Sequence, residues 1–188
     1  MAAVLVNRRI VLIAMCCCCC MAAGAQTRID PPAKIEVGFG PENDRVERFV
    51  LRCLAEATGS IRLAAYAFSA PRIVDALIDA HKRGVDVKLV VDFRHNIEED
   101  RKGLGRTAPN RLVNAGIAVR TNNLYRTHHD KYSVIDERTV QTASYNYADS
   151  AKLNSENAIV VQNDKAVAAQ YLAHWNERYR TGHDYNTH

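Results

Sequence analysis

The sequence predicts an α/β fold, a single domain in which one mixed β-sheet is flanked by helices on both faces. Between residues 35 and 91, apolar strand-like runs alternate with amphipathic helical stretches in the order β-α-β-α-β. The runs at 61–68 and 85–91 are almost continuously apolar, which is typical of strands covered on both faces. Further short strand-like runs and a last amphipathic helix complete the pattern.

The first half of the domain is predicted to start with a strand at residues 35–39. A helix follows, which Asn43 or Asp44 can cap and Gly59 ends. The next strand, at 61–68, alternates too little for an exposed strand, and we expect it in the centre of the sheet.

Pro71 marks the second helix, because proline fits the first turn of a helix. Ser69 or Ala70 is expected near its cap. Gly84 closes this helix before the buried strand at 85–91.

The second half is predicted to contain a short helix around 109–115, a small strand at 117–120 and the strands that carry the polar motifs described below. An amphipathic helix at 166–179 ends the domain, which spans residues 35–182, and residues 183–188 are expected to be a frayed tail. The inner face of the last helix is expected to carry Tyr171, Leu172 and Trp175.

Residues 1–25 read as an export signal. Arg8 and Arg9 precede an apolar run, and Ala23-Gly24-Ala25 supplies the small residues of a cleavage site. The protein is therefore predicted to be exported, periplasmic or secreted. Retention as an inner-membrane anchor is the alternative, although the run is shorter than the roughly 20 residues that a spanning helix needs. Residues 26–34 contain two prolines and read as an extended linker.

Removal of residues 1–25 leaves 163 residues with one cysteine, Cys53, so no disulfide can form within the mature chain. The net charge falls from +4 to +2 with the loss of Arg8 and Arg9, and so weak an excess does not by itself indicate nucleic acid. Basic residues gather before the motif, where they form either a basic rim near the site or an ordinary solvated loop. They are Arg94, His95, Arg101, Lys102, Arg106, Arg111, Arg120, Arg126 and His128.

The most informative motif is H-x-K-x4-D, formed by His129, Lys131 and Asp136 in a strand-like segment. Alternate residues of a strand share a face, so His129 and Lys131 are expected to project into one site. A neutral imidazole is a nucleophile near neutral pH, and a nearby ammonium can stabilise phosphoryl oxygens. The pair therefore predicts chemistry on a phosphate ester.

Two further motifs follow in order. Ser144 and Asn146 form S-x-N, and N-S-E-N at 154–157 precedes an apolar strand and contains Glu156. With the segments at 35–39, 83–88 and 174–178, this combination resembles the phospholipase D superfamily, and more narrowly its small secreted bacterial endonucleases that carry one motif per chain. The family usually has glycine before the serine of S-x-N, where this chain has Ala143, so the turn beside the phosphate is expected to differ slightly.

The resemblance implies a phospholipase D-like fold and a metal-independent phosphodiesterase without a cofactor. Because the family uses two H-x-K motifs, it also implies a homodimer in which His129 of one copy attacks phosphorus while the partner's His129 protonates the leaving oxygen. Lys131 and Asn146 would hold the phosphoryl oxygens, Ser144 would support their loop, and Glu156 would hydrogen-bond the imidazole. Asp136 is expected to be structural.

The expected substrate is nucleic acid, DNA or RNA, cut with little sequence preference. Hydrolysis of phospholipid head groups is the alternative enzyme activity, and a catalytically silent nucleic-acid-binding domain is the alternative of another class.

Other side chains have simpler expected roles. A metal site at His128-His129-Asp130 is disfavoured, because adjacent strand residues point to opposite faces and no ligand spacing supports it. His128 is expected at the rim and His174 on a helix surface. Tyr145 and Tyr147 either stack on a base or pack in the core, and core positions are expected for Tyr66 and Phe68.

Overall fold

The computed structural model describes residues 31–187 except 101–102 and 104. The expected export signal at 1–25, most of the expected linker at 26–34, and Arg101 and Lys102 of the basic stretch lie outside the described residues. No helix among the described residues is both long and apolar enough to cross a membrane.

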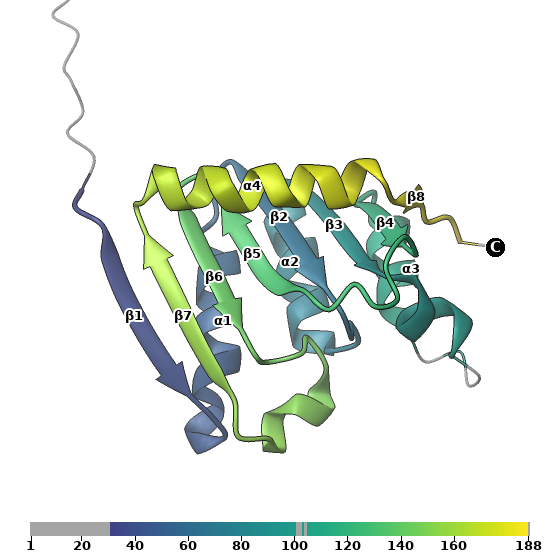
Figure 1. Ribbon diagram of the computed structural model, residues 1–188, viewed down its shortest axis with the longest axis horizontal. Helices are drawn as coiled ribbons and strands as arrows, with labels where there is room; N and C mark the ends of the chain where they lie inside the picture. The colour runs from purple at the N-terminus through teal and green to yellow at the C-terminus, as the bar shows by residue number, and fades with distance from the viewer. Residues whose placement is uncertain (1–30, 101–102, 104, 188) are drawn as a thin grey trace, which may run out of the picture.

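One eight-stranded mixed sheet forms the centre of the molecule, in the order β1-β7-β6-β5-β2-β3-β4-β8 (Figure 1). Strands β2, β3 and β4 are parallel to one another, and every other neighbouring pair is antiparallel. The strands are β1 (Lys34–Phe39), β2 (Ser60–Ala65), β3 (Asp86–Asp92), β4 (Ala118–Asn122), β5 (Lys131–Ile135), β6 (Thr139–Ala143), β7 (Asn157–Gln162) and β8 (His183–Asp184).

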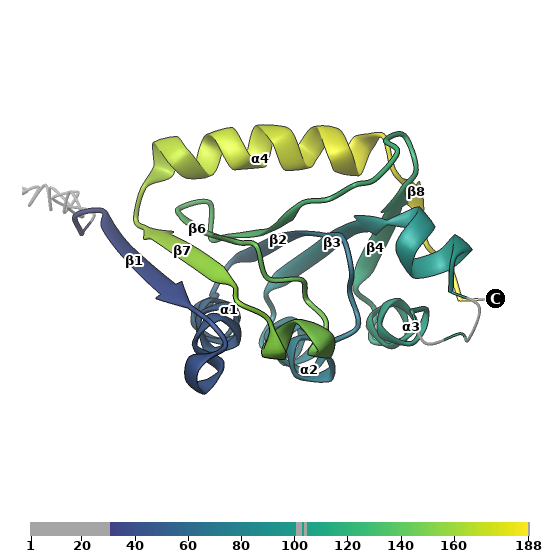
Figure 2. The ribbon, with the colours of Figure 1, turned by 60° about the horizontal axis from the view of Figure 1, so that its bottom comes forward.

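Helices cover both faces of the sheet, as predicted. Figure 2 shows α1, α2 and α3 beneath one face and α4 alone over the other. The α-helices are α1 (Arg45–Glu56), α2 (Pro71–Lys82), α3 (Thr107–Asn114) and α4 (Lys165–Arg180). Three short helical segments are η1 (Glu42–Asp44), η2 (Arg94–Glu98) and η3 (Asp149–Leu153).

Each face of the sheet has its own hydrophobic core. The larger core fills the space between the sheet and the first three α-helices, and the smaller one lies under α4 around Trp175. The indole Nε1 of Trp175 donates to the backbone oxygen of Leu63 at 3.0 Å, which fixes α4 on β2. Asp164 caps α4 by accepting from the amides of Ala166 and Val167.

Most predicted elements occur with shifted ends. Strand β2 stops at Ala65, before the predicted end, and Phe68 instead forms an isolated bridge with Tyr147. The expected frayed tail is wrong for its first residues, because His183 and Asp184 pair with Thr121 and Arg120 of β4.

Cys53 of α1 is a free cysteine and is 2% exposed. Burial raises the pKa of its thiol to about 12. The side chain therefore acts as a small apolar group in the larger core.

Candidate active site

His129 and Lys131 meet at the start of β5, as their spacing predicts. The Nζ atom of Lys131 lies 3.1 Å from Nδ1 of His129 and donates to the backbone oxygen of the same residue at 2.9 Å. Lys131 is only 8% exposed, whereas the imidazole is open to solvent. With Nδ1 occupied, Nε2 is the ring nitrogen left for a substrate.

The surroundings of this pair favour a neutral imidazole. Partial burial and the Lys131 charge both lower the pKa of His129, although Asp130 and Asp92 oppose them. Burial likewise lowers the pKa of Lys131, against the fields of Asp130 and Glu156. Since neutral imidazole is the nucleophilic form, the site favours attack by His129 at neutral pH.

Tyr66 forms one wall of the site, not part of the core as expected. Its ring centroid lies 4.6 Å from that of His129 and 4.6 Å from that of His95, so the tyrosine is held between two imidazoles. The Nζ atom of Lys131 lies 5.3 Å from the same ring. Tyr66 therefore restricts the orientation of both side chains of the motif.

Two buried polar side chains, Asp92 at the end of β3 and Asn96 in η2, hold this wall in place. Asn96 accepts from the amide of Phe68 and donates to the backbone oxygens of Tyr66 and Asp92. The carboxylate of Asp92 accepts from the amides of His95 and His128, at 2.6 and 2.7 Å. The backbone on both sides of Tyr66 and before His129 is thus fixed by two side chains that are each 1% exposed.

Asp136 lies at the opposite end of β5 from Lys131. Its carboxylate accepts from the amides of Thr58, Gly59 and Ser60 and from the Thr58 hydroxyl, at 2.7 to 2.9 Å. Partial burial opposes ionisation, but these donors outweigh it and lower the pKa of Asp136. The third residue of the motif fixes the turn before β2 and makes no contact with the reacting groups.

The S-x-N segment and Glu156 form a second group, beyond the end of β6. The Ser144 hydroxyl donates to Glu156 and accepts from the amide of Asn157, and Asn154 donates to the other carboxylate oxygen of Glu156. Asn146 lies beside them, with its Oδ1 buried and without a partner among the described residues. The expected hydrogen bond from Glu156 to His129 does not form within one chain, because β6 separates β7 from β5.

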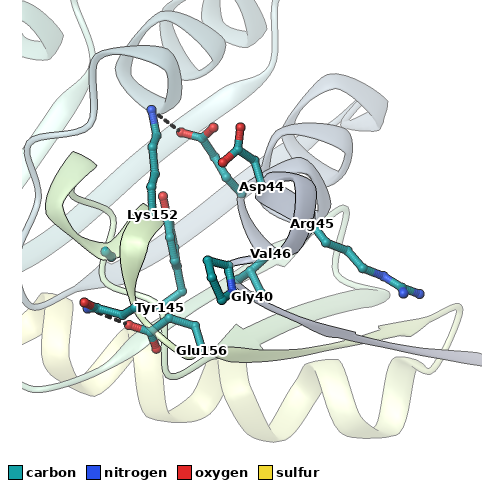
Figure 3. Close-up of a pocket in the computed structure, with 11 residues that line it drawn as sticks. Gly40, Asp44, Arg45, Val46, Tyr145, Lys152 and Glu156 are labelled. Atoms are coloured by element: carbon teal, nitrogen blue, oxygen red, sulfur yellow. Dashed lines mark hydrogen bonds and ion pairs between the residues drawn. The ribbon is translucent and has the colours of Figure 1, made fainter.

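A small cavity of about 10 Å³ underlies this group (Figure 3). Tyr145, Lys152 and Glu156 line it, and Lys152 reaches the buried Glu47 carboxylate at 3.2 Å. Arg72 binds the other Glu47 oxygen at 2.6 Å. These contacts anchor the S-x-N loop to α1 and α2.

Tyr145 and Tyr147 are core residues, 2% and 0% exposed, so neither can stack on a base. Of the two expectations for these tyrosines, packing is the correct one. Ala143 has no left-handed backbone conformation and pairs regularly with Ala158, so the alanine fits this strand without strain.

The main cleft, of about 450 Å³, opens over His129 and Lys131 and reaches α4. Asp130, Tyr132 and His174 also line it, and sequence reasoning missed all three as site residues. The only signal was the resemblance around residues 174–178, because folding alone brings α4 to the motif. His129 and Asp130 precede β5, so the alternation that would separate their side chains does not hold.

The expected basic rim is only partly present. His128 is 2% exposed and lies beneath the surface, because its backbone is drawn inward by Asp92. Arg111 and Arg120 are paired with Asp75 and Asp184. Arg94 is exposed but pairs with Glu98 and Glu99 at 3.5 Å, and His95 and Arg126 are also exposed.

Within the described residues, no cluster of three or more histidine, cysteine, aspartate or glutamate side chains has the geometry to hold a metal ion.

Known proteins resemble this chain over most of its described length. The family model described as cardiolipin synthase, PLD-like domain, matches residues 50–179. A crystal structure of a phospholipase D family member, Nuc from Salmonella typhimurium, is 39% identical with a TM-score of 0.78, and the match covers 83% of this chain and 100% of that chain.

Two curated relatives are longer than the matched region. Phospholipase D of Rickettsia bellii is 34% identical over 147 residues, which are 78% of this chain and 69% of the relative. Human mitochondrial cardiolipin hydrolase is 31% identical over 128 residues, and the match covers 68% of this chain and 48% of the relative. The family model covers most of the described chain and includes the cleft with His129 and Lys131, so the chain belongs to the phospholipase D superfamily and is a phosphodiesterase of that superfamily.

Proposed function

We propose that this phosphodiesterase is an endonuclease that cleaves DNA or RNA with little sequence preference, without a metal ion, at a site shared by two copies of the chain. The observation that carries the proposal is the open cleft in which His129 and Lys131 are held together. The likeness to Nuc along the whole of that protein supports the small one-motif type of enzyme. No base-reading motif accompanies the cleft, so phosphate contacts would dominate binding.

The proposed reaction has two steps. Nε2 of His129 attacks phosphorus, forming a P–N bond while the P–O bond to the leaving group breaks, and the partner's His129 gives its proton to the departing oxygen. Water then attacks phosphorus and loses a proton to the partner's His129 as the P–N bond breaks. Lys131 and Asn146 stabilise the charge on the phosphoryl oxygens.

An exposed apolar face next to the cleft supports the proposal that two copies of the chain form a dimer. Ile35, Val37 and Phe39 of β1 and Ile159 of β7 are 67%, 49%, 61% and 41% exposed. The register places Val37 beside Ile159, and Ile159 beside Thr142, which lines the cleft. A two-fold dimer would bury this face and bring two clefts together.

The dimer would also explain the place of Glu156. Its carboxylate does not reach the imidazole of its own chain, so the orienting hydrogen bond expected from the resemblance would have to go to the partner's His129. We further propose that the protein acts outside the cytoplasm, on the basis of the signal-like residues 1–25.

Plasmid nicking in excess chelator tests the activity. The wild-type protein should nick DNA, and His129→Ala should abolish nicking while its circular dichroism spectrum stays unchanged. His183→Ala, an exposed histidine on β8, is the matched control and should nick normally. Cleavage that stops when chelator is added would disprove the metal-free reaction.

Phospholipid is the second candidate substrate, because the names of two relatives, phospholipase D and cardiolipin hydrolase, specify lipid substrates. The chemistry at phosphorus would be the same. Parallel digestion of plasmid DNA, RNA and cardiolipin vesicles by one preparation decides between them, and faster release from cardiolipin than from either nucleic acid would favour the lipid.

A further inference from the structure

Asp130 and His174 form a polar pair in the main cleft that the proposed reaction does not use. Both line the cleft beside His129. Nε2 of His174 lies 3.9 Å from Oδ2 of Asp130, which is too far for a direct hydrogen bond. The two groups are therefore close and complementary, but they are not joined.

The neighbouring residues fix the orientation of His174. The Tyr132 hydroxyl lies 2.8 Å from Nδ1 of His174, and the Tyr132 ring packs edge-on against Tyr171 at 4.9 Å. Burial raises the pKa of Tyr132, so its hydroxyl stays protonated and can donate to Nδ1. A proton on Nε2 then points into the cleft, on the side where the Asp130 carboxylate lies.

The pair thus offers one donor and one acceptor to the same point in space. An oxygen about 2.8 Å from each atom fits the gap, if it accepts from His174 and donates to Asp130. A hydroxyl group satisfies both conditions. A phosphate oxygen has no proton to donate and is repelled by the carboxylate, and a hydrogen atom in place of the hydroxyl makes neither contact.

We propose that Asp130 and His174 recognise a hydroxyl group that lies beside the scissile phosphodiester. In a nucleic acid this is the ribose 2′-hydroxyl, so the enzyme prefers RNA to DNA. The inference rests on the proposed function, which includes both nucleic acids as substrates. The hydroxyls of a glycerol head group have the same chemistry, and they are the second source of this ligand.

The test compares ribo- and deoxyribo-oligonucleotides of one sequence. We expect wild-type kcat/KM to be about tenfold higher for the ribo-oligonucleotide, the effect of one hydrogen-bonded hydroxyl. His174→Phe and Asp130→Leu should each bring this ratio close to one. His183→Phe, the matched control on β8, should keep it. A wild-type ratio near one, or a ratio that neither folded variant changes, overturns the proposal.

Two further arms separate this proposal from the proposed function. Faster hydrolysis of phosphatidylglycerol than of phosphatidylethanolamine vesicles, lost in both variants, would support hydroxyl recognition and identify the lipid as its source. If no diester is cleaved, the proposed function fails. Hydroxyl recognition is then tested by measuring the binding of the same two oligonucleotides with fluorescence anisotropy. Tighter binding of the ribo-oligonucleotide by wild type alone supports the pair, and equal affinities overturn it.

Discussion

Asp136→Asn should destabilise the protein strongly without disabling the catalytic groups. The carboxylate accepts four hydrogen bonds, and the amide of asparagine would place a donor against at least one of the donors from Thr58, Gly59 or Ser60. Hydrogen bonds to a charged group contribute about 1.5–3 kcal/mol each, and partial exposure of this turn keeps the total loss near 3 kcal/mol. For a domain of this size, that loss lowers Tm by about 6–12 °C.

The assay is urea unfolding at pH 7, followed by circular dichroism. Glu137→Gln is the matched control, since it makes the same chemical change at the next residue, which also has a positive φ, and it should cost less than about 0.5 kcal/mol. Asparagine tolerates the φ of 51° at position 136 as well as aspartate does, so backbone strain does not confuse the result.

The contribution of Asp136 to the free energy of unfolding should decrease in acid. The pKa of Asp136 is lower in the folded than in the unfolded state, so its contribution is present above about pH 4 and disappears as the pH falls through the folded value. The difference between wild type and Asp136→Asn should therefore shrink in acid. If Asp136→Asn unfolds at the same urea concentration as the wild type but no longer cleaves substrate at 25 °C, the structural role of Asp136 is refuted.

Three other predictions concern the site, the proposed dimer and the second core. The rate should show a bell-shaped pH profile whose acid limb lies below about pH 6.5, since burial and Lys131 lower the pKa of His129, and a rate that rises steadily through neutrality would contradict acid–base pairing. Phe39→Asp should yield monomers by light scattering and lose cleavage in parallel, whereas Leu124→Asp, which is equally exposed but lies on a loop away from β1, should do neither. Trp175→Phe should cost about 2 kcal/mol in urea unfolding, from the lost bond to Leu63 and the lost indole volume, and a cost under 0.5 kcal/mol would show that α4 is not held there.

Local patterns predicted much of the fold. Continuous apolar runs located β2 and β3, and Pro71 marked the first turn of α2. The pairing of β1 with β7, and of β8 with β4, could not be predicted, because strands that meet across the whole sequence carry no local signal for their partners. Short edge strands such as β8 are held by only a few contacts, and composition alone does not separate them from a tail.

In the site, as in the fold, local contacts could be predicted from the sequence and contacts between distant elements could not. His129 and Lys131 are only two residues apart in the sequence, so the contact between them is local and could be predicted from their spacing. His174 could not be placed in the cleft, because its position depends on how α4 crosses the sheet. The prediction of His128 at the rim was wrong, because its backbone amide donates a hydrogen bond to Asp92, which lies on another strand.

The burial of Cys53 bears on how the protein withstands air and oxidants. Only thiolates react quickly with disulfides and peroxides, and a thiol with a pKa of about 12 on the buried face of α1 is almost never in that form. Among the described residues no other cysteine is present, so this part of the protein should need no reducing agent during purification and should form no sulfur-linked aggregates on storage.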